Sequence, residues 1–331
     1  TKMVLESGLL RETADAFDLC GPLPPLAIPS TLQDSLMARL DRLSKVKEIA
    51  QIGAVMGREF SYELMRTVYP LEDTLLRFSL GQLVEAELLF QKGDGANATY
   101  IFKHALVQEA AYQSLVKSRR QHYHQLIAQV LETHFPHEAA MEMEVLAHHY
   151  IEANLPWQAI PYLLRAGATA ANRSAHSEAI THLNRALELL KILPDGTRRW
   201  ELEINALIAL GVSFAQTRGY DVREVERTYA RARALSEQCG TPGQLFQSRY
   251  GLWRLHMLRA EYHTATRQGE ELLELALRQE NDAFLIAAHR ALGATVFYRG
   301  QFRRSMEHVA SVIAATSGTV GDSATLISDI Y

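Results

Sequence analysis

The sequence LRAGATAANRSAHSEAITHLNRA, residues 164–186, shows how most of this chain is built, because two helical patterns flank a short polar turn. Gly167 in the first half and Ala179 in the second half are small residues separated by twelve positions. Small side chains at facing positions let two helices pack closely together. The stretch therefore predicts a helical hairpin whose two arms meet near Gly167 and Ala179.

The same interval of twelve positions recurs further along the chain. It separates Trp253 from Ala265, and it separates Gly293 from Ser305. A further unit around Gly211 fits after an insertion of roughly two residues, and successive units begin about forty residues apart, a period typical of stacked helical repeats. We therefore expect a tetratricopeptide-like α-solenoid. Frequent helix breaks disfavour the alternative of a heptad coiled coil.

The solenoid is expected to cover residues 119–310, and residues 311–331 are expected to form an atypical tail. From residue 119 the pattern is helical and is interrupted by short polar or Gly/Pro breaks. The tail contains no Lys or Arg and loses the repeat. The expected breaks lie near Pro136, Pro156, Ser174, Pro194, Gly219, Gly240, Glu280 and Gly300.

Residues 30–118 have a different pattern, in which short helices precede two strands. Ser44 and Ser61 are suitable capping residues for two of these helices. The sequence ELLFQKGDGANATYIFK, residues 87–103, predicts two strands around a Gly-Asp-Gly turn. Helices followed by a β-hairpin form a winged helix, so the expected fold class is mainly α, with a winged-helix domain before the solenoid. Residues 1–29 are expected to hold the end of a helix and a connector rich in Pro and Gly.

Composition places the chain among globular proteins and excludes several functional classes. Of its 331 residues, 47% are apolar and 22% are charged, and the net charge of −4 gives no overall attraction to nucleic acid or to an anionic membrane. No stretch is long and apolar enough to predict a transmembrane helix. Cys20 and Cys239 lie far apart in the sequence, which favours a reducing, cytoplasmic location over a disulfide.

Four segments carry a resemblance to a known family: IPSTLQDSLMARLDRLSKVKEIAQIGAVMGREFSYEL (residues 28–64), LVEAELLFQKG (83–93), ATYIFKHALVQEAAYQSLVKSRRQHYHQLIAQVLE (98–132) and LAHHYIEANLPWQAIPYLLRAG (146–167). They closely resemble bacterial signalling proteins, the signal-transduction ATPases with numerous domains (STAND ATPases). In that family an effector, often a class III adenylate or guanylate cyclase and sometimes a kinase, precedes an AAA-type P-loop ATPase, a helical lid, a winged helix and tetratricopeptide repeats. The resemblance implies that this chain is a regulatory, protein-interacting region downstream of the ATPase, beginning in the lid helix.

The chain contains no G-x-x-x-x-G-K-[ST] phosphate-binding loop, so we expect no catalytic residue, no cofactor and no enzymatic activity within it. The resemblance implies that ADP or ATP binds to the ATPase domain of a longer parent protein. Because the chain begins with Thr1 inside an apolar pattern, we interpret it as a fragment of that parent.

His104 is the candidate nucleotide-sensing residue. It lies between a predicted strand that ends at Phe102 and an amphipathic helix, and the start of a helix attracts anions such as phosphate. The surrounding sequence resembles a motif of related switch ATPases, in which a Met-His-Asp triplet begins this helix and the histidine contacts the β-phosphate of ADP. Here Lys103-His104-Ala105 matches only the histidine. The alternative, that His104 simply packs or caps at this corner, stays open.

The inward face of the solenoid is the expected binding surface for a protein or peptide partner. The first helix of each pair presents arginine and aromatic side chains at the usual inward positions, and such side chains suit a peptide. The alternative, that several of them are buried between repeats, stays open. The candidate groove residues are Asn172, Gln216, Tyr250, Arg254, Arg290 and Tyr298.

No metal site is predicted, because neither His148-His149 nor His122 and His124 place two imidazoles on one helix face. Two alternative functions stay open: a fragment of a transcriptional regulator of the MalT type, and a plain repeat scaffold. Direct DNA binding is disfavoured because residues 72–87 contain four acidic side chains and one arginine, and a recognition helix needs cations for phosphate.

Overall fold

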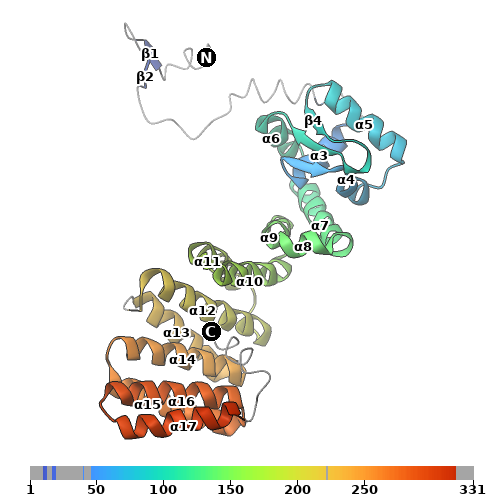
Figure 1. Cartoon of the computed structure of the whole chain (residues 1–331). Coiled ribbons are helices and arrows are strands. Elements are labelled where there is room, and N and C mark those ends of the chain that lie inside the picture. The colour runs from blue at the N-terminus through green and yellow to red at the C-terminus, as the bar shows by residue number, and fades with distance from the viewer. Residues whose placement is uncertain (1–9, 13–16, 20–39, 41–45, 221–222, 318–331) are drawn as a thin grey trace. The chain divides into compact units, whose positions relative to one another are not determined.

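The computed structural model describes residues 10–12, 17–19, 40, 46–220 and 223–317. These residues are mostly helical, and the few strands lie towards the N-terminus (Figure 1). The chain divides into two compact units, residues 1–130 and 131–331. The division falls within helix α7 (Lys117–His134), whereas the sequence places a domain boundary after residue 118.

The first unit contains a short β-hairpin, a three-stranded antiparallel sheet and several helices. The strand order of the sheet is β3-β5-β4, so β5 pairs with both neighbours. The elements that precede α7 are β1 (Leu10–Glu12), β2 (Phe17–Leu19), α3 (Lys47–Met56), β3 (Glu59–Ser61), α4 (Tyr62–Val68), α5 (Asp73–Glu85), β4 (Leu89–Lys92), a 3-10 turn (Gly95–Asn97), β5 (Thr99–Phe102) and α6 (Ala105–Gln113).

Most of the local predictions for the first unit are confirmed. Ser61 caps α4, because its hydroxyl accepts a hydrogen bond from the backbone N–H of Leu64 at 3.1 Å. Helix α5 and strands β4 and β5 lie where the sequence predicts them. Most of the helix expected after residue 30 lies outside the described residues, as does the predicted cap Ser44, and α3 begins after Val46.

One prediction for the first unit is corrected, and one strand was missed. Leu10 is not helical but begins β1, which pairs with β2, while residues 1–9 lie outside the described part. Strand β3 was not predicted at all, because a strand of three residues is too short to show an alternating pattern. Phe60 on this strand packs on Tyr100 and Phe102 at ring-centre distances of 5.8 and 6.1 Å, which fixes the strand to the core.

The second unit is a solenoid of helices, each packed mainly against its neighbours in the sequence (Figure 1). Among the described residues, no helix combines the length and the apolar character needed to cross a bilayer. The helices that follow α7 are α8 (Pro136–Met141), α9 (Met143–Glu152), α10 (Pro156–Asn172), α11 (His176–Lys191), α12 (Thr197–Arg218), α13 (Arg223–Cys239), α14 (Pro242–Leu258), α15 (Tyr262–Gln279), α16 (Asp282–Tyr298) and α17 (Phe302–Ser317).

The interval of twelve residues marks the contact between paired helices. At Gly167 on α10, a Cβ atom would lie 3.6 Å from the carbonyl oxygen of Ala179 on α11, so the two backbones approach closely. In the last pair, the hydroxyl of Ser305 donates a hydrogen bond to the carbonyl of Gly293 at 3.0 Å. The predicted helix pairing is therefore confirmed.

The predicted helix breaks are also confirmed, and several share one backbone conformation. Ser174, Ala260 and Gly300 lie five residues before the small residue of the second helix, and their φ angles are 62°, 59° and 74°. This left-handed conformation reverses the chain in a tight turn, and it is strained for residues other than glycine. The expected tail is corrected in part, because α17 extends to Ser317; residues 318–331 lie outside the described part.

Candidate partner-binding site

A hollow of about 180 Å³ lies between α12 and α14 in the second unit. Three of the six predicted groove residues, Gln216, Tyr250 and Arg254, line it together. The helical period explains this, because residues four positions apart share one face of a helix and the lining residues of α12 follow that spacing. The full lining is Ile208, Val212, Gln216, Tyr220, Tyr229, Gln247, Tyr250, Gly251 and Arg254.

The floor of the hollow is formed by Tyr229, whose ring lies between two glycines. A Cβ atom at Gly211 would lie 2.7 Å from this ring, and one at Gly251 would lie 2.3 Å from it. The side chain of Tyr229 is therefore held between α12 and α14 and is only 4% exposed. Its burial raises the pKa of the Tyr229 phenol, so the group stays neutral at physiological pH.

The walls of the hollow combine a cation, amides and aromatic rings. The guanidinium carbon of Arg254 lies 5.3 Å from the ring centre of Tyr220, an arrangement that fixes the cation beside an aromatic surface. Gln216 is exposed at the rim. Tyr250 is only 8% exposed and packs on Trp253 at a ring-centre distance of 4.9 Å, so it contributes mainly to the core beneath the hollow.

The other predicted groove residues lie elsewhere. Arg290 lines a second hollow, of about 310 Å³, between α16 and α17. Tyr298 lines neither hollow; it is 62% exposed and stacks on Tyr262 at 5.9 Å. Asn172 is exposed at the end of α10 and lines neither hollow either. The second hollow is lined by His289, Arg290, Gly293, Ala294, Phe297, Ser305, Val309, Val312 and Ile313.

His104 occupies the corner between strand β5 and helix α6, as the sequence predicts. It is the N-cap residue of α6, and its backbone carbonyl accepts a hydrogen bond from the Val107 N–H at 3.0 Å. The imidazole is exposed and makes no capping hydrogen bond to the helix. The side chain at this helix start is therefore accessible to a ligand from outside the chain.

Sequence reasoning missed two features of the second unit. Tyr220 and Gln247 line the hollow, although only the recurring inward positions were considered as groove residues. Glu144, Glu178 and His182 come together elsewhere on the solenoid, although only pairs of histidines were considered for a metal site. The spacing of Glu178 and His182, four residues apart on one helix, is the signal that was overlooked.

No protein-family model matches the chain. An uncharacterised protein of Rhizobium meliloti (strain 1021) is 25% identical to it over 292 residues, which represent 86% of this chain and 28% of that protein. The chain thus spans less than a third of the length of this relative.

Three solved structures are similar to the chain at low identity. BtubC from P. vanneervenii has a TM-score of 0.42 and 14% identity, and the match covers 86% of this chain and 92% of that one. A STAND protein with a tetratricopeptide repeat sensor from Pyrococcus horikoshii has a TM-score of 0.41 and 10% identity, and the match covers 89% of this chain and 53% of that one. A Rap protein complexed with competence and sporulation factor has a TM-score of 0.36 and 12% identity, and the match covers 86% of this chain and 98% of that one. With TM-scores of 0.42 or less, these likenesses assign no function to the chain.

Proposed function

We propose that the chain is a non-catalytic regulatory region that binds a protein or peptide partner on its helical repeats and transmits binding to the nucleotide state of an upstream ATPase. The observation that carries this proposal is the hollow between α12 and α14, where Gln216, Tyr220 and Arg254 lie together. Arginine and aromatic side chains supply much of the binding energy in protein interfaces, and solenoids present concave surfaces to their partners.

The chemistry of the hollow favours a peptide with a carboxylate beside an apolar or aromatic side chain. Arg254 supplies a cation that suits the carboxylate, and Gln216 and Gln247 supply amides that donate and accept hydrogen bonds. Ile208 and Val212 supply apolar surface on α12. A partner of this kind buries apolar area and pairs its charge at the same site.

Coupling to nucleotide is proposed through the first unit, which we interpret as a winged helix. The order of helix, strand, two helices and two strands, with β5 at the centre of the sheet, supports this interpretation. His104 at the start of α6 would donate a hydrogen bond to a phosphate oxygen of ADP held by the upstream ATPase. Partner binding activates the parent if the partner binds more tightly to the state in which this contact is broken.

The proposed setting is a bacterial signalling protein of the cytoplasm, whose upstream effector is of the nucleotide cyclase type. The resemblance of the sequence to STAND ATPases supports this setting, as does the scarcity of cysteine. Cys239 is a free thiol in the described part of the chain.

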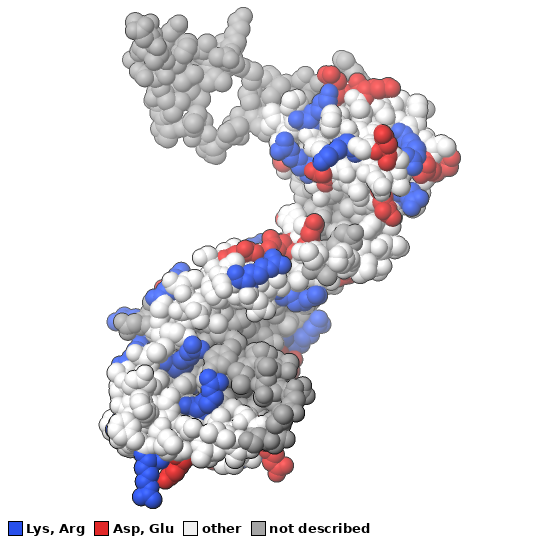
Figure 2. Space-filling model, viewed as in Figure 1, with Lys and Arg blue, Asp and Glu red and all other residues white. Residues whose placement is uncertain are grey.

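Direct reading of DNA by the first unit is disfavoured by its charges. The Nε–H of Arg77 on α5 donates to the Asp73 carboxylate at 2.7 Å, so this guanidinium already has an anionic partner. Acidic and basic side chains are interspersed on the visible face of the first unit (Figure 2). A phosphate backbone requires an excess of cations instead.

The experiment selects peptides from a displayed random library against the purified chain and measures their Kd by fluorescence anisotropy. Arg254→Glu should raise the Kd of a selected peptide that carries a carboxylate beside an aromatic side chain by about tenfold or more, because the substitution replaces an anchoring cation by an anion. Arg227→Glu, a matched charge reversal at an exposed position on α13, should leave the Kd nearly unchanged. Equal affinity of the Arg254→Glu variant and the native chain would contradict the proposed site.

The nucleotide proposal has a separate experiment in a longer protein that includes an ATPase domain. His104→Ala should speed ADP release by about tenfold or more, because a hydrogen bond to a charged phosphate is lost. His122→Ala, at an exposed position on α7, is the matched control. Unchanged ADP release from the His104→Ala variant would remove His104 from the mechanism and leave the partner-binding proposal intact.

A further inference from the structure

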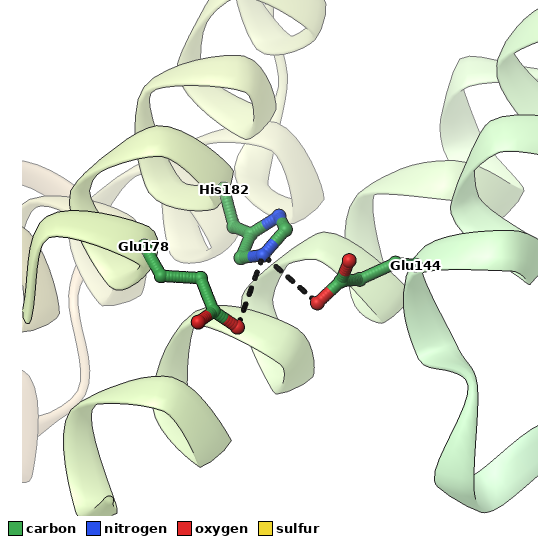
Figure 3. A group of neighbouring side chains, drawn as sticks. All are labelled: Glu144, Glu178 and His182. Carbon is green, nitrogen blue, oxygen red and sulfur yellow. Dashed lines mark ion pairs between the residues drawn. The ribbon is translucent and has the colours of Figure 1, made fainter. Parts of the chain in front are cut away.

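Three side chains with metal-ligating atoms converge on one side of the solenoid, away from the hollow between α12 and α14. Glu144 lies on α9, and Glu178 and His182 lie on α11. One ligand atom of each residue lies within 4.8 Å of the others. Both carboxylates point towards the same nitrogen of the imidazole ring (Figure 3).

The arrangement follows from the helix geometry. Glu178 and His182 are four residues apart on α11, so they occupy the same face of that helix. Glu144 comes from α9, and α10, which packs against both α9 and α11, separates the two helices in the sequence. The cluster therefore joins two helices that are not consecutive.

The distances suit coordination of a small cation. The Nε2 atom of His182 lies 3.2 Å from Oε1 of Glu144 and 3.8 Å from Oε1 of Glu178. Ligand bonds of about 2.1 Å at tetrahedral angles place neighbouring ligand atoms about 3.4 Å apart, which lies between these two distances. The two carboxylate oxygens lie within 4.8 Å of each other, so a shift of the exposed glutamate side chains brings all three atoms to one ion.

The imidazole nitrogen is buried and not engaged in a hydrogen bond. The side chain of His182 is 14% exposed, and its Nε2 atom makes no hydrogen bond within the described residues. The Glu144 oxygen lies 3.2 Å from this nitrogen, and the two groups form an ion pair when the imidazole is protonated. In the neutral imidazole the buried nitrogen has no hydrogen bond to the described part of the chain, which is unfavourable, and coordination to a cation would satisfy it.

The local charge also favours a cation. A hollow of about 250 Å³ adjoins the cluster, and three carboxylates, from Glu142, Glu144 and Glu178, line it together with the single guanidinium of Arg173. The excess of negative charge attracts a divalent ion. Glu144 and Glu178 are largely exposed, so the ion has a path from solvent, and water can complete its coordination.

We propose that Glu144, Glu178 and His182 bind one divalent transition-metal ion of the Zn²⁺ type. A mixed set of one imidazole and two carboxylates suits Zn²⁺, whereas Mg²⁺ and Ca²⁺ prefer oxygen ligands alone. The bound ion links α9 to α11 across α10 and holds the first helices of the solenoid in one arrangement. The site is independent of the partner-binding hollow.

The test titrates the chelator-treated chain with Zn²⁺ by isothermal calorimetry and repeats the titration with Co²⁺ while recording visible absorption. We expect one ion per chain and, for Co²⁺, the intense absorption bands of a tetrahedral site. Glu144→Gln and His182→Gln should each weaken binding by about tenfold or more, because each removes a ligand. His263→Gln, the same substitution at an exposed position on α15, should not change it.

Glu144→Gln guards against misfolding, because it alters an exposed side chain on a different helix from His182. Far-UV circular dichroism of each variant confirms that the helices are intact. The proposal is wrong if the native chain shows no saturable uptake of either ion, or if both variants keep the native affinity. In either case the three residues form only an ion-paired contact between helices.

Discussion

Replacing Gly251 by alanine tests whether close helix approach holds the solenoid together. Gly251 on α14 faces the ring of Tyr229 on α13, and a Cβ atom there would lie 2.3 Å from the nearest ring carbon and 2.5 Å from two others. Carbon atoms prefer separations of about 3.5–4.0 Å, so the ring or the helix must move by roughly 1 Å. The ring has no room to retreat, because Gly211 on α12 contacts it as well.

The expected change in the free energy of unfolding of the Gly251→Ala variant is the sum of two opposing effects. In an exposed helix, replacing glycine by alanine stabilises the protein by about 1 kcal/mol, since alanine has the higher helix propensity. Forcing an extra methyl group into a packed core costs about 1–3 kcal/mol, and the overlap at Gly251 calls for the upper end of that range. The free energy of unfolding should therefore fall by about 2 kcal/mol in the Gly251→Ala variant.

The assay is urea unfolding followed by circular dichroism at 222 nm on the native chain and the variant. Gly243→Ala is the matched control in the same helix, because a Cβ atom at Gly243 would lie no closer than 3.8 Å to its neighbours. This control should be neutral or slightly stabilising. A Gly251→Ala variant as stable as the control would refute the view that Tyr229 fills the space between two glycines.

Two further predictions concern the turns and the first unit. Ala260→Gly should raise the free energy of unfolding by about 0.5–1 kcal/mol in the same urea assay, because Ala260 has a φ angle of 59° and Gly300 occupies the equivalent position of the last repeat. The hydroxyls of Tyr123 and Tyr69 donate hydrogen bonds to the Glu48 carboxylate at 2.7 and 2.8 Å, and these bonds lower the pKa of Glu48 below its usual 4.5. The ionised carboxylate therefore stabilises the folded state above pH 4.5, and this contribution is lost as the pH falls through the lowered pKa. In urea unfolding at pH 7, the Glu48→Gln variant should be less stable than the native chain by about 1 kcal/mol, and at pH 3 the difference should be smaller. An equal difference at both pH values would contradict a stabilising role for the Glu48 carboxylate.

The parts of the fold that the sequence predicts well are those with local physical causes. Helix breaks coincide with proline, glycine and left-handed residues, and Ser61 begins α4 because its side chain satisfies a backbone donor. The interval from Gly167 to Ala179 is predictable because close approach of two helices permits only small residues at the contact. These signals lie within one hairpin and need no knowledge of distant segments.

The parts that the sequence did not predict depend on residues far apart in the chain. Strand β3 is stabilised by its pairing with β5, which no pattern within three residues can reveal. The sequence leaves open whether Tyr250 faces a partner or is buried between repeats; the packing of α14 against its neighbours buries most of its side chain beside the hollow. Glu144 meets His182 only because α10 brings α9 and α11 together.

The binding proposal is examined best by hydrogen exchange and mass spectrometry on the native chain, with and without a saturating selected peptide. Slower amide exchange should concentrate in the facing stretches of α12 and α14, from Ile208 to Gln216 and from Gln247 to Arg254. Protection confined to α16 and α17, or to the first unit, would contradict a partner site between α12 and α14.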